Sequence, residues 1–531
     1  MNRTILVIAL VVAACGAPAS VPELPDWRDE VVYHVFVRSF ADSNGDRHGD
    51  LKGLTGRLPY LRDLGVTTLL LLPVVESPFY HNYFPTDYDA IDPEYGRMDD
   101  WIAFVRAAHA ESLKVVMDME TQYATTGHPW LDDAWRNPAS PYADFVAWTD
   151  SAHENVLGFY GIDTAEPTIS FWPDRRSAIV HLDLRSDSVR AWTARYFAFW
   201  ADPNGDGLLD DGVDGYRMDH IMDDLDNRGV FTDLYDGFWK PVFDGARAVN
   251  LGLFIVGEQA DWASFGEDMM ERSTADAAFG FGVRFTLADL LRPGANPDSA
   301  ATRFAGVVNA TLARTPPGKF QVTFLENHDT SRWASEMAGD GRLLRMGAVL
   351  QFTLPGVPSI YYGQELGLPG LQGKWGFDAN DIPIREAFPW TADADSNATW
   401  YGEDGPWGDM SIYRTGAADS LTLTVQRADS SSIWHQYRRL VAWRKARIEW
   451  RKGSFVPLPT GSESILAFAR ESGADRTVVI ANLSDSTITI DPRATGILGY
   501  RAIDVQAASN EDPWGLGPKG YAVMVSPAKG S

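Results

Sequence analysis

Cysteine, basic side chains and long hydrophobic runs are scarce in this sequence. Cys15 is the only cysteine among 531 residues, which excludes a disulfide within the chain, so stability must come from core packing and from any bound metal. The apolar run at residues 4–14 is too short to cross a bilayer as a permanent helix. The 46 basic and 72 acidic residues give a formal charge of -26, which repels nucleic acid and anionic surfaces. We therefore expect no nucleic-acid partner.

The first fifteen residues have the order of an export signal. Arg3 supplies a positive charge, the apolar run follows, and Cys15 comes directly after Val12-Ala13-Ala14. This order resembles the bacterial lipobox, in which the cysteine is lipidated; a buried free thiol is the alternative. We expect residues 1–15 to be a lipoprotein-type signal and residues 16–26 a tether. The protein would be exported and held at a membrane by its lipid anchor alone, in the periplasm or at the cell surface.

From about Trp27 onward, short apolar runs alternate with stretches of helical period. This alternation is typical of βαβ units around a parallel sheet. Eight such units favour an α/β fold of the (β/α)8 TIM barrel type over an open sheet. The predicted strands are 31–36, 67–72, 114–117, 215–218, 254–257, 277–279, 321–324 and 359–362, and the predicted helices include 101–112, 189–200, 234–249, 343–352 and 432–445.

Two connections are longer than ordinary loops and indicate added structure. About 60 residues separate the third strand from residue 184, and we expect a small inserted domain there, at about 122–182. The segment 363–431 is predicted to be an elaborated loop region beside the active site. After residue 451 the pattern changes to alternating strands, at 465–470, 477–483, 486–490 and 521–525. The sequence therefore predicts a barrel over 27–450 and a C-terminal all-β sandwich domain over 451–531.

Acidic side chains stand where four of the predicted strands end. Asp118 follows the third strand, Asp219 the fourth, Glu258 the fifth and Asp329 the seventh. The C-terminal ends of barrel strands carry the functional side chains of this fold. Hydrolysis of a glycosidic bond needs two carboxyl groups, one protonated and one ionised. Asp219 and Glu258, on adjacent strands, could form that pair.

Arg217 stands two residues before Asp219 and therefore faces the same side of the strand. A guanidinium there would hold the Asp219 carboxylate ionised through a charge-assisted hydrogen bond. We therefore expect a raised pKa for Glu258 and not for Asp219.

These segments resemble the four signature regions of the α-amylase family of glycoside hydrolases, and the resemblance covers nearly all of the mature chain. The matching segments are Asp118, Gly215-Tyr216-Arg217-Met218-Asp219, Gly257-Glu258, Glu326-Asn327-His328-Asp329, His181-Leu182-Asp183-Leu184, Gly356-Val357-Pro358-Ser359-Ile360-Tyr361-Tyr362-Gly363, and Tyr83 with Asp87. Any one of these strings arises by chance, whereas their order along the chain is specific.

The resemblance implies a retaining enzyme that cleaves α-glucosidic bonds in starch-like glucans or maltooligosaccharides. Asp219 would be the nucleophile, Glu258 the general acid/base and Asp329 the stabiliser of the transition state. The residues expected to bind substrate around them are Arg217, His328, Tyr83, Asp87 and Asp118.

The sequence also departs from the family pattern. Gln122-Tyr123 stands where the first signature region usually ends in Asn-His, so the usual interdomain calcium site is not supported. His220 and Asp223-Asp224 replace the Lys-His of endo-acting amylases, and Tyr80 stands where exo-acting α-glucosidases commonly carry Asp. Linkage preference and endo or exo action therefore stay open.

Two acidic turns place oxygen ligands at positions 1, 3, 5 and 9, a spacing that suits Ca²⁺, although neither has the Glu at position 12 of an EF-hand. The first resembles the calcium loop of oligo-1,6-glucosidase relatives, although Arg47 within it argues against a cation. A solvated Asp/Gly turn is the alternative for the second. We expect a structural Ca²⁺ held by Asp42, Asn44, Asp46 and Asp50, or by Asp202, Asn204, Asp206 and Asp210.

Two other functions fit parts of the pattern. A transglycosylase or glucan isomerase would use the same fold and acids, with a sugar hydroxyl replacing water at the covalent intermediate. A non-catalytic glycan-binding surface lipoprotein is the second alternative. Such proteins generally lose one of the acids, whereas Asp219, Glu258, Asp329 and Arg217 all remain.

Overall fold

The computed structural model describes residues 24–159, 168–172, 175–375, 378–402, 405–493, 495–506 and 515–527, with backbone alone at 168–172 and 175. The predicted signal with Cys15, and most of the predicted tether, lie outside these residues. Within the described part of the chain, every helix is too short or too polar to cross a membrane.

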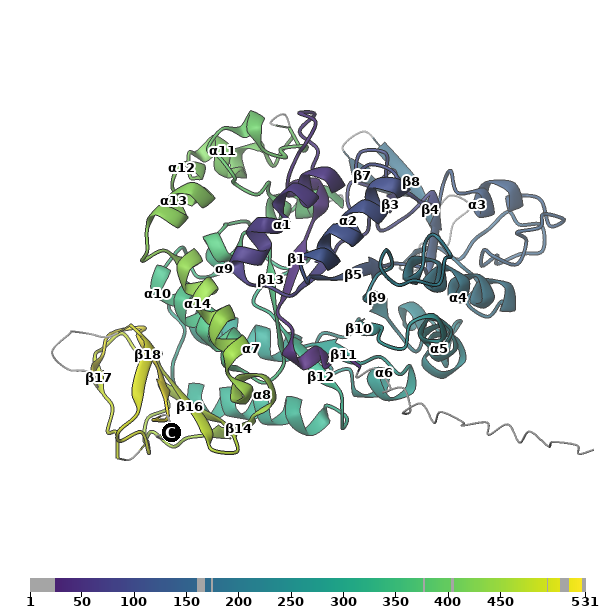
Figure 1. Ribbon diagram of the computed structural model, residues 1–531. Helices are drawn as coiled ribbons and strands as arrows, with labels where there is room; N and C mark the ends of the chain where they lie inside the picture. Colours follow the sequence, from purple (N-terminus) through teal and green to yellow (C-terminus); the bar gives the residue numbers. More distant parts are fainter. Residues whose placement is uncertain are drawn as a thin grey trace, which may run out of the picture.

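Eight parallel strands close into a barrel, as predicted, and follow one another around it in chain order (Figure 1). Each predicted strand overlaps an observed one, and the boundaries differ by a few residues at most. The barrel strands are β1 (Val32–Val35), β2 (Thr68–Leu71), β5 (Lys114–Met119), β9 (Gly215–Ile221), β10 (Phe254–Gln259), β11 (Ala277–Phe279), β12 (Phe320–Thr323) and β13 (Val357–Tyr361).

Helices surround the barrel, and all five that the sequence predicted are present. Residues 234–249 form a π-helical turn, η5 (Tyr235–Trp239), that continues into an α-helix. Side chains cap several of the helices: Ser186 and Ser432, for example, accept backbone N–H bonds at the starts of α4 and α14. The main helices are α1 (Leu51–Leu64), α2 (Met98–Ala110), α4 (Asp187–Ala201), α5 (Lys240–Val249), α7 (Phe281–Leu291), α8 (Ala300–Arg314), α10 (Gly341–Thr353) and α14 (Ile433–Ala446).

The strands bury both faces, as expected for a parallel sheet that is covered on each side. Val32, Val116, Val256 and Val322 belong to one buried cluster, and neighbours of opposite orientation such as Tyr33 belong to the larger cluster under the helices. Each buried aliphatic side chain of this kind stabilises the fold by about 1.5–3 kcal/mol. The rigid barrel that results fixes the positions of the side chains at its strand ends.

A small antiparallel sheet lies in the chain between β5 and β9, within the range predicted for the inserted domain. Its strand order is β6-β8-β7, and β7 packs against the 3-10 helix η7 (Asp378–Arg385). A second small pair, β3 and β4, follows β2. These elements are β3 (Val75–Glu76), β4 (Asp87–Ile91), β6 (Tyr123–Thr125), α3 (Pro129–Ala134), β7 (Thr168–Trp172) and β8 (Arg175–His181).

The segment predicted as an elaborated loop region consists largely of short helices. Figure 1 shows α11 to α13 along the outside of the barrel, next to α1 and α14. The short helices here and elsewhere are α6 (Glu267–Arg272), α9 (Trp333–Glu336), η6 (Gln364–Leu366), η8 (Ala394–Ser396), η9 (Gly408–Met410), α11 (Ile412–Thr415), α12 (Ala418–Leu421) and α13 (Leu423–Ala428).

The C-terminal domain has two antiparallel layers, which agrees with the predicted sandwich. Phe468 and Val523 lie on the face of the large sheet that joins the main core, and Ile480 lies on the opposite face with Leu516 of the small sheet. After α15 (Ile448–Lys452), the large sheet has the order β14-β15-β16-β20-β18 and the small sheet pairs β17 with β19. The strands are β14 (Ser454–Pro457), β15 (Ile465–Ser472), β16 (Asp475–Asn482), β17 (Ile488–Thr489), β18 (Arg501–Val505), β19 (Gly515–Leu516) and β20 (Tyr521–Val525).

Candidate active site

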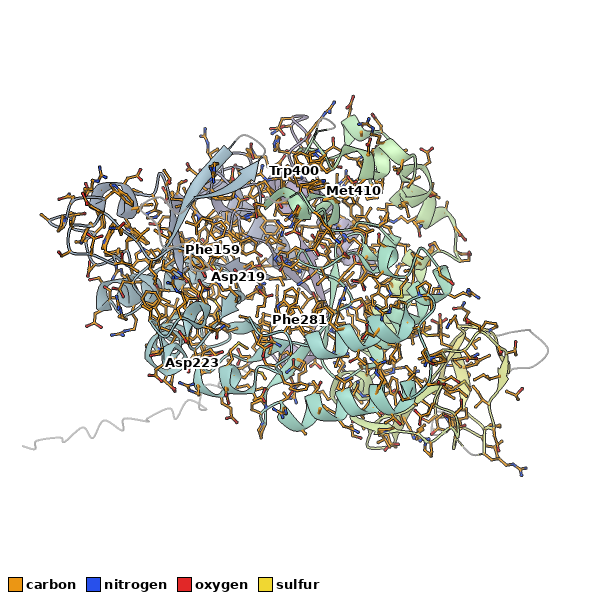
Figure 2. All side chains as sticks on the ribbon, turned by 180° about the vertical axis from the view of Figure 1, so that it is seen from behind. Phe159, Asp219, Asp223, Phe281, Trp400 and Met410 are labelled. Atoms are coloured by element: carbon orange, nitrogen blue, oxygen red, sulfur yellow. The ribbon has the colours of Figure 1, made fainter. Side chains whose placement is uncertain are left out.

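A cavity of about 290 Å³ lies at the C-terminal end of the barrel. The ends of β9 and β10, the loops after β2 and β12, and helix η7 all contribute to its wall. Figure 2 shows Asp219 close to Phe159 near the middle of the molecule, and both residues line the cavity. The polar side chains in the wall include Tyr83, Asp219, Glu258, His328, Asp329 and Arg385. Five of these six were predicted from the sequence.

Arg217 is the centre of the polar network beneath the cavity. Its side chain is buried, and Nη1 donates to Asp118 Oδ1 at 2.8 Å and to Asp219 Oδ1 at 2.6 Å. Nη2 donates to Glu258 Oε2. Burial disfavours the charge, but these carboxylates raise the pKa of Arg217 well above its usual value. One guanidinium therefore fixes two carboxyl groups that the sequence predicted as a pair.

The two carboxyl groups differ in protonation. Burial alone would raise the pKa of Asp219, but His220 and Arg217 lower that pKa below its usual range. Burial raises the pKa of Glu258, and Arg217 only partly opposes the shift. Glu258 Oε1 also accepts a bond from Trp262 Nε1 at 3.2 Å. Of the two carboxyl groups, Glu258 has the raised pKa and Asp219 the lowered one, which agrees with the expectation, so the pair can hold one proton acceptor and one proton donor at neutral pH.

A β-bulge places the nucleophile candidate. Met218 pairs with Gly257 and Ile221 pairs with Gln259, so Asp219 and His220 together oppose the single residue Glu258. A regular strand would send Asp219 and His220 to opposite faces. The bulge removes that alternation, and both side chains line the cavity.

Tyr83 and His328 form a stacked pair on the other side of Arg217. Tyr83 Oη donates to Asp118 Oδ2 at 2.7 Å and lies 2.6 Å from His328 Nε2, and the two ring centroids are 5.5 Å apart. Burial and Arg217 lower the pKa of His328 well below its usual value, so the imidazole is neutral. Because Tyr83 donates its proton to Asp118, Nε2 of His328 carries the hydrogen that Tyr83 accepts.

Asp329 completes the set of acids and contacts two residues of the wall. Its Oδ2 is 3.0 Å from His328 Nε2, and its Oδ1 is 3.4 Å from Arg385 Nη2. Burial and the neighbouring Glu258 raise the pKa of Asp329 well above its usual value. The three predicted acids, Asp219, Glu258 and Asp329, therefore surround one cavity.

Sequence reasoning missed several wall residues. Arg385 donates from Nε to the backbone oxygen of His328 at 3.1 Å, although it lies in η7, far along the chain. His81 reaches across to Asp378 Oδ2 at 2.8 Å, which joins the loop after β2 to η7. No local pattern distinguishes these residues. The only available signal was the unusual length of the segment after β13.

Asp87, predicted to bind substrate, lies apart from the other predicted site residues. Asp87 is exposed at the start of β4, outside the wall of the cavity, and its Oδ1 accepts the backbone N–H of Asp89 at 2.9 Å. Its neighbour Tyr88 is buried, and alternation along the strand turns Asp87 outward.

In the first acidic turn, several side-chain oxygens accept hydrogen bonds from backbone N–H groups of the turn itself. Asp42 Oδ1 accepts the N–H of Asn44 at 2.9 Å, and Asn44 Oδ1 accepts the N–H of Asp46 at 2.8 Å. Asp50 Oδ1 accepts the N–H of Gly53 at 2.7 Å and thereby caps α1. None of these four side chains has a buried oxygen without a hydrogen-bond partner. The turn therefore offers little that requires a cation.

In the second acidic turn, the structure differs from the prediction at the fourth expected ligand, Asp210. Asp210 lies 3.0 Å from Arg106 Nε in an exposed ion pair, whereas the next residue, Asp211, is fully buried. Burial, opposed by Arg106, raises the pKa of Asp211, and the neighbouring Asp206 and Asp202 add to the rise.

Two oxygens of the second turn are buried without a hydrogen-bond partner, Asp202 Oδ1 and Asp211 Oδ1. Asn204 and Asp206 lie beside them, and Asn204 Nδ2 donates to Asp206 Oδ2 at 3.0 Å and to Asp211 Oδ2. A buried carboxylate oxygen without a partner is costly, and a hard cation is one group that satisfies such an oxygen.

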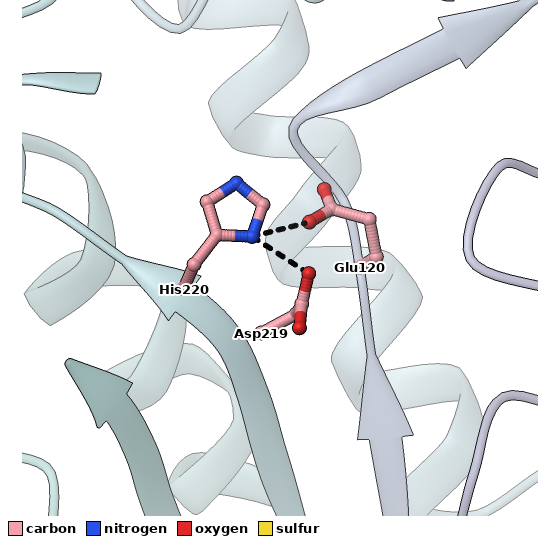
Figure 3. Close-up of side chains that lie close together, drawn as sticks. All are labelled: Glu120, Asp219 and His220. Carbon is pink, nitrogen blue, oxygen red and sulfur yellow. Dashed lines mark hydrogen bonds and ion pairs between the residues drawn. The ribbon is translucent and has the colours of Figure 1, made fainter. Parts of the chain in front are cut away.

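Three potential ligand groups meet beside the cavity, Glu120, Asp219 and His220 (Figure 3). Their nearest atoms lie within 4.8 Å of one another, which is the only such group of at least three His, Cys, Asp or Glu residues in the described part of the chain. His220 Nδ1 lies 2.7 Å from Asp219 Oδ2, which is a hydrogen bond in which the ring nitrogen donates. That nitrogen carries a proton and has no free lone pair for a metal.

Comparison with known proteins places this site in a family. Residues 34–453 match the family described as the alpha amylase catalytic domain. Alpha-amylase 3 of Dictyoglomus thermophilum is 30% identical over 468 residues, which cover 87% of this chain and 86% of that protein. Trehalose synthase/amylase TreS of Mycobacterium tuberculosis (strain H37Rv) is 25% identical over 513 residues, covering 87% and 82%.

The fold is shared as well. The solved structure of Eubacterium rectale Amy13B covers 96% of this chain and 98% of its own, with a TM-score of 0.75 at 23% identity. With a closed eight-stranded barrel, a C-terminal antiparallel sheet domain and a family match over most of its length, the chain belongs to the α-amylase family of glycosidases.

Proposed function

We propose that this protein hydrolyses α-glucosidic bonds in starch-like glucans or maltooligosaccharides with net retention at the anomeric carbon. The main support for this proposal is the arrangement of the two carboxyl groups around Arg217. Arg217 binds Asp219 and Glu258 at once, while the pKa of Asp219 is lowered and that of Glu258 is raised. A retaining glycosidase needs such a pair, an ionised nucleophile beside a protonated acid.

The reaction has two steps. In the first, Glu258 protonates the glycosidic oxygen as Asp219 attacks the anomeric carbon, which forms a covalent glycosyl-enzyme. In the second, Glu258 takes a proton from water, the water oxygen attacks the anomeric carbon, and the bond to Asp219 breaks. Asp329 and the neutral His328 line the same cavity and would bind sugar hydroxyls. Tyr83, which stacks on His328, lines the cavity as well and would contact the sugar there.

Transglycosylation is the second candidate, and a neighbouring cavity favours it. This cavity of about 810 Å³ shares Ala260 with the active-site cavity and is lined by residues that follow β9 and β10. A sugar bound there could present a hydroxyl to the glycosyl-enzyme in place of water. The identity of the products decides between the two reactions.

The test is product analysis with the chain truncated after Cys15, given maltoheptaose, amylose, pullulan, isomaltose and sucrose. We expect shorter sugars released first as the α-anomer, and no release by Asp219→Asn. Asp223→Asn, in the neighbouring cavity, is the matched control and should retain hydrolysis. Longer or isomerised products would favour transglycosylation. Products released as the β-anomer, or no turnover of any α-glucoside, would refute the proposal.

We propose that the second acidic turn binds a structural Ca²⁺ through Asp202, Asn204, Asp206 and Asp211. The two buried oxygens without hydrogen-bond partners support this site. Asp211 takes the place that the sequence pattern gave to Asp210. For the first turn, Ca²⁺ binding by Asp42, Asn44, Asp46 and Asp50 stays a prediction from spacing alone.

We also propose that the protein is exported and anchored to a membrane through a lipid on Cys15. The support is the order of charge, apolar run and cysteine in the first fifteen residues. Detergent phase partition of the expressed full chain and of Cys15→Ala tests it. We expect the wild-type chain in the detergent phase and the variant in the aqueous phase; the same partition for both would refute the anchor.

A further inference from the structure

His220 contacts the Asp219 carboxylate (Figure 3), at the oxygen that Arg217 does not bind. Its Nδ1 lies 2.7 Å from Asp219 Oδ2, while Arg217 Nη1 lies 2.6 Å from Oδ1. The other ring nitrogen, Nε2, lies 2.8 Å from Tyr123 Oη, and the two rings stack with centroids 5.5 Å apart. Both oxygens of Asp219 are therefore held, each by a different nitrogenous side chain.

The backbone is distorted to place this histidine. His220 is the second residue of the β-bulge opposite Glu258, and its φ angle is 20°. Non-glycine residues rarely adopt positive φ, and such conformations occur preferentially at functional sites. The bulge brings His220 beside Asp219, whereas a regular strand would turn it away.

The hydrogen-bond partners of the ring suit a doubly protonated histidine. Asp219 is ionised and can only accept, so Nδ1 of His220 must donate. Tyr123 Oη lies 3.3 Å from Asp226 Oδ1 and can donate its hydroxyl proton there, in which case its oxygen accepts from Nε2 of His220 at 2.8 Å. A ring that donates from both nitrogens is the imidazolium cation.

The surrounding charges favour the same state. The acidic groups that face His220 are Asp219, Glu120 Oε2 at 3.8 Å and Glu258, whose Oε2 lies 3.5 Å from the His220 backbone nitrogen. Arg217 is the neighbouring cation, and its charge is shared among carboxylates. Burial opposes the charge on the ring, but Asp219, which is ionised, is the main group that raises the pKa of His220 to about 9. The pKa values of Glu120 and Glu258 are themselves raised, so their negative charge adds less.

We propose that His220 is a positioning residue, an imidazolium that holds the nucleophile as a second cationic donor and speeds hydrolysis of the glycosyl-enzyme. This inference rests on the proposed function. In the first step Asp219 loses its charge as the ester forms, and the cation gives no advantage. In the second step water attacks the anomeric carbon, Glu258 takes the proton, and the electron pair of the broken bond returns to Asp219. A cation beside Oδ2 stabilises the departing carboxylate.

The first test concerns protonation and does not depend on activity. The ring signals of His220 are assigned by NMR as those absent from His220→Asn. We expect the imidazolium form at pH 7 in the wild-type chain, and a lower titration midpoint in Asp219→Asn, because the partner charge is removed. A neutral ring at pH 7 in the wild-type chain would overturn the inference.

The second test uses 4-nitrophenyl α-maltoside, whose good leaving group makes the first step fast. In His220→Asn the amide can still donate to Asp219, but the charge is lost. We expect kcat to fall about 10- to 100-fold, with a parallel fall in KM and a burst of about one nitrophenol per enzyme, because the covalent intermediate accumulates. Equal falls in kcat and kcat/KM without a burst would show damage to both steps and overturn the inference.

Two further variants distinguish loss of the His220 hydrogen bonds from a general effect of removing an imidazole. His435→Asn, in α14, controls for loss of a half-buried imidazole and should leave the kinetics unchanged. Tyr123→Phe keeps the ring stack but removes the acceptor of Nε2, and its effect on kcat should lie between those of wild type and His220→Asn. If the wild-type chain releases no nitrophenol, the proposed function is wrong, and so is the proposed effect of His220 on the rate of hydrolysis. The NMR titration does not depend on activity and still decides whether His220 is a cation.

Discussion

Asp219 and Glu258 share one arginine and yet hold their protons differently. Asp219 has cationic donors on both oxygens, Arg217 and His220, which stabilise its ionised form. Glu258 has Arg217 and the neutral N–H of Trp262, which do not outweigh burial. The hydrogen bond from His220 is thus the contact that Asp219 has and Glu258 lacks, and the charge of Asp219 further raises the pKa of Glu258.

A single substitution next to Glu258 should shift the pKa of that residue. Trp262 Nε1 donates to Glu258 Oε1 at 3.2 Å and so favours the ionised carboxylate. In Trp262→Phe this bond is lost while the ring stack on Phe281 is kept. The pKa of Glu258 should then rise, and the alkaline limb of kcat/KM should move up by about half to one pH unit.

The measurement is the pH profile of kcat/KM for the two chains. Trp443→Phe, in α14, is the matched control and should leave the profile where it is. A shift of the alkaline limb to lower pH in Trp262→Phe would show that Glu258 is not the acid that this limb reports.

Elements of regular period were predictable, and contacts between distant segments were not. The eight barrel strands are short runs of buried residues with clear ends, and periodicity located each of them. The acids at strand ends followed from the strands. Arg385 and His81 reach the cavity only because η7 folds back over the barrel, which no local pattern encodes.

At two predicted sites the structure places a side chain differently from the sequence pattern, for local reasons. Asp87 belongs to a β-strand whose alternation turns it to solvent, so its nearness to Tyr83 in the sequence was misleading. In the second acidic turn, spacing selected Asp210, but the chain buries Asp211 and leaves Asp210 exposed, with Arg106 in contact with both. Ligand spacing does not report which of two adjacent carboxylates points inward.

For a single structural element, the second acidic turn, we predict an effect of Ca²⁺ on thermal stability. Asp211→Asn removes a charge from the proposed Ca²⁺ site, and Asp210→Asn, one residue earlier, is the matched control. We expect Ca²⁺ to raise the melting temperature of the wild-type and Asp210→Asn chains by several degrees, and to raise that of Asp211→Asn much less.

Thermal unfolding after chelator treatment, with and without added Ca²⁺, measures this effect. The same stabilisation by Ca²⁺ in Asp211→Asn as in wild type would refute the site. Loss of the effect in Asp42→Asn instead would assign the ion to the first turn.

The molecule as a whole buries acidic groups that must stay protonated. Glu365 is fully buried, its Oε1 accepts from Tyr33 Oη at 2.7 Å and from Tyr60 Oη at 2.5 Å, and its Oε2 has no hydrogen-bond partner. Burial raises the pKa of Glu365, and likewise that of Glu386, from 4.5 to about 7. Because of these groups, the free energy of unfolding depends on pH.

The sign of the effect follows from proton binding. Between pH 4.5 and 7 the folded chain keeps protons on Glu365 and Glu386 that the unfolded chain has released. The contribution of each group to the free energy of unfolding therefore falls as pH rises through this window, by at most about 3 kcal/mol. Glu365→Gln keeps a neutral acceptor and removes the titration.

We expect the variant to lose less stability than wild type between pH 5 and 7, measured by urea unfolding at each pH. Glu154→Gln, an exposed residue, is the control and should behave as wild type. Equal pH dependence in Glu365→Gln and wild type would show that Glu365 does not titrate in this range.

The central claim is a covalent intermediate on Asp219, and trapping it is the most direct test. In Glu258→Gln the general base is missing, so a sugar transferred from α-maltosyl fluoride, which needs no acid assistance, should remain attached. Peptide mass spectrometry after rapid digestion should find the maltosyl group on the peptide that contains Asp219, with fragmentation placing it on that residue. A sugar on another residue, or no adduct while the fluoride is consumed, would contradict the account.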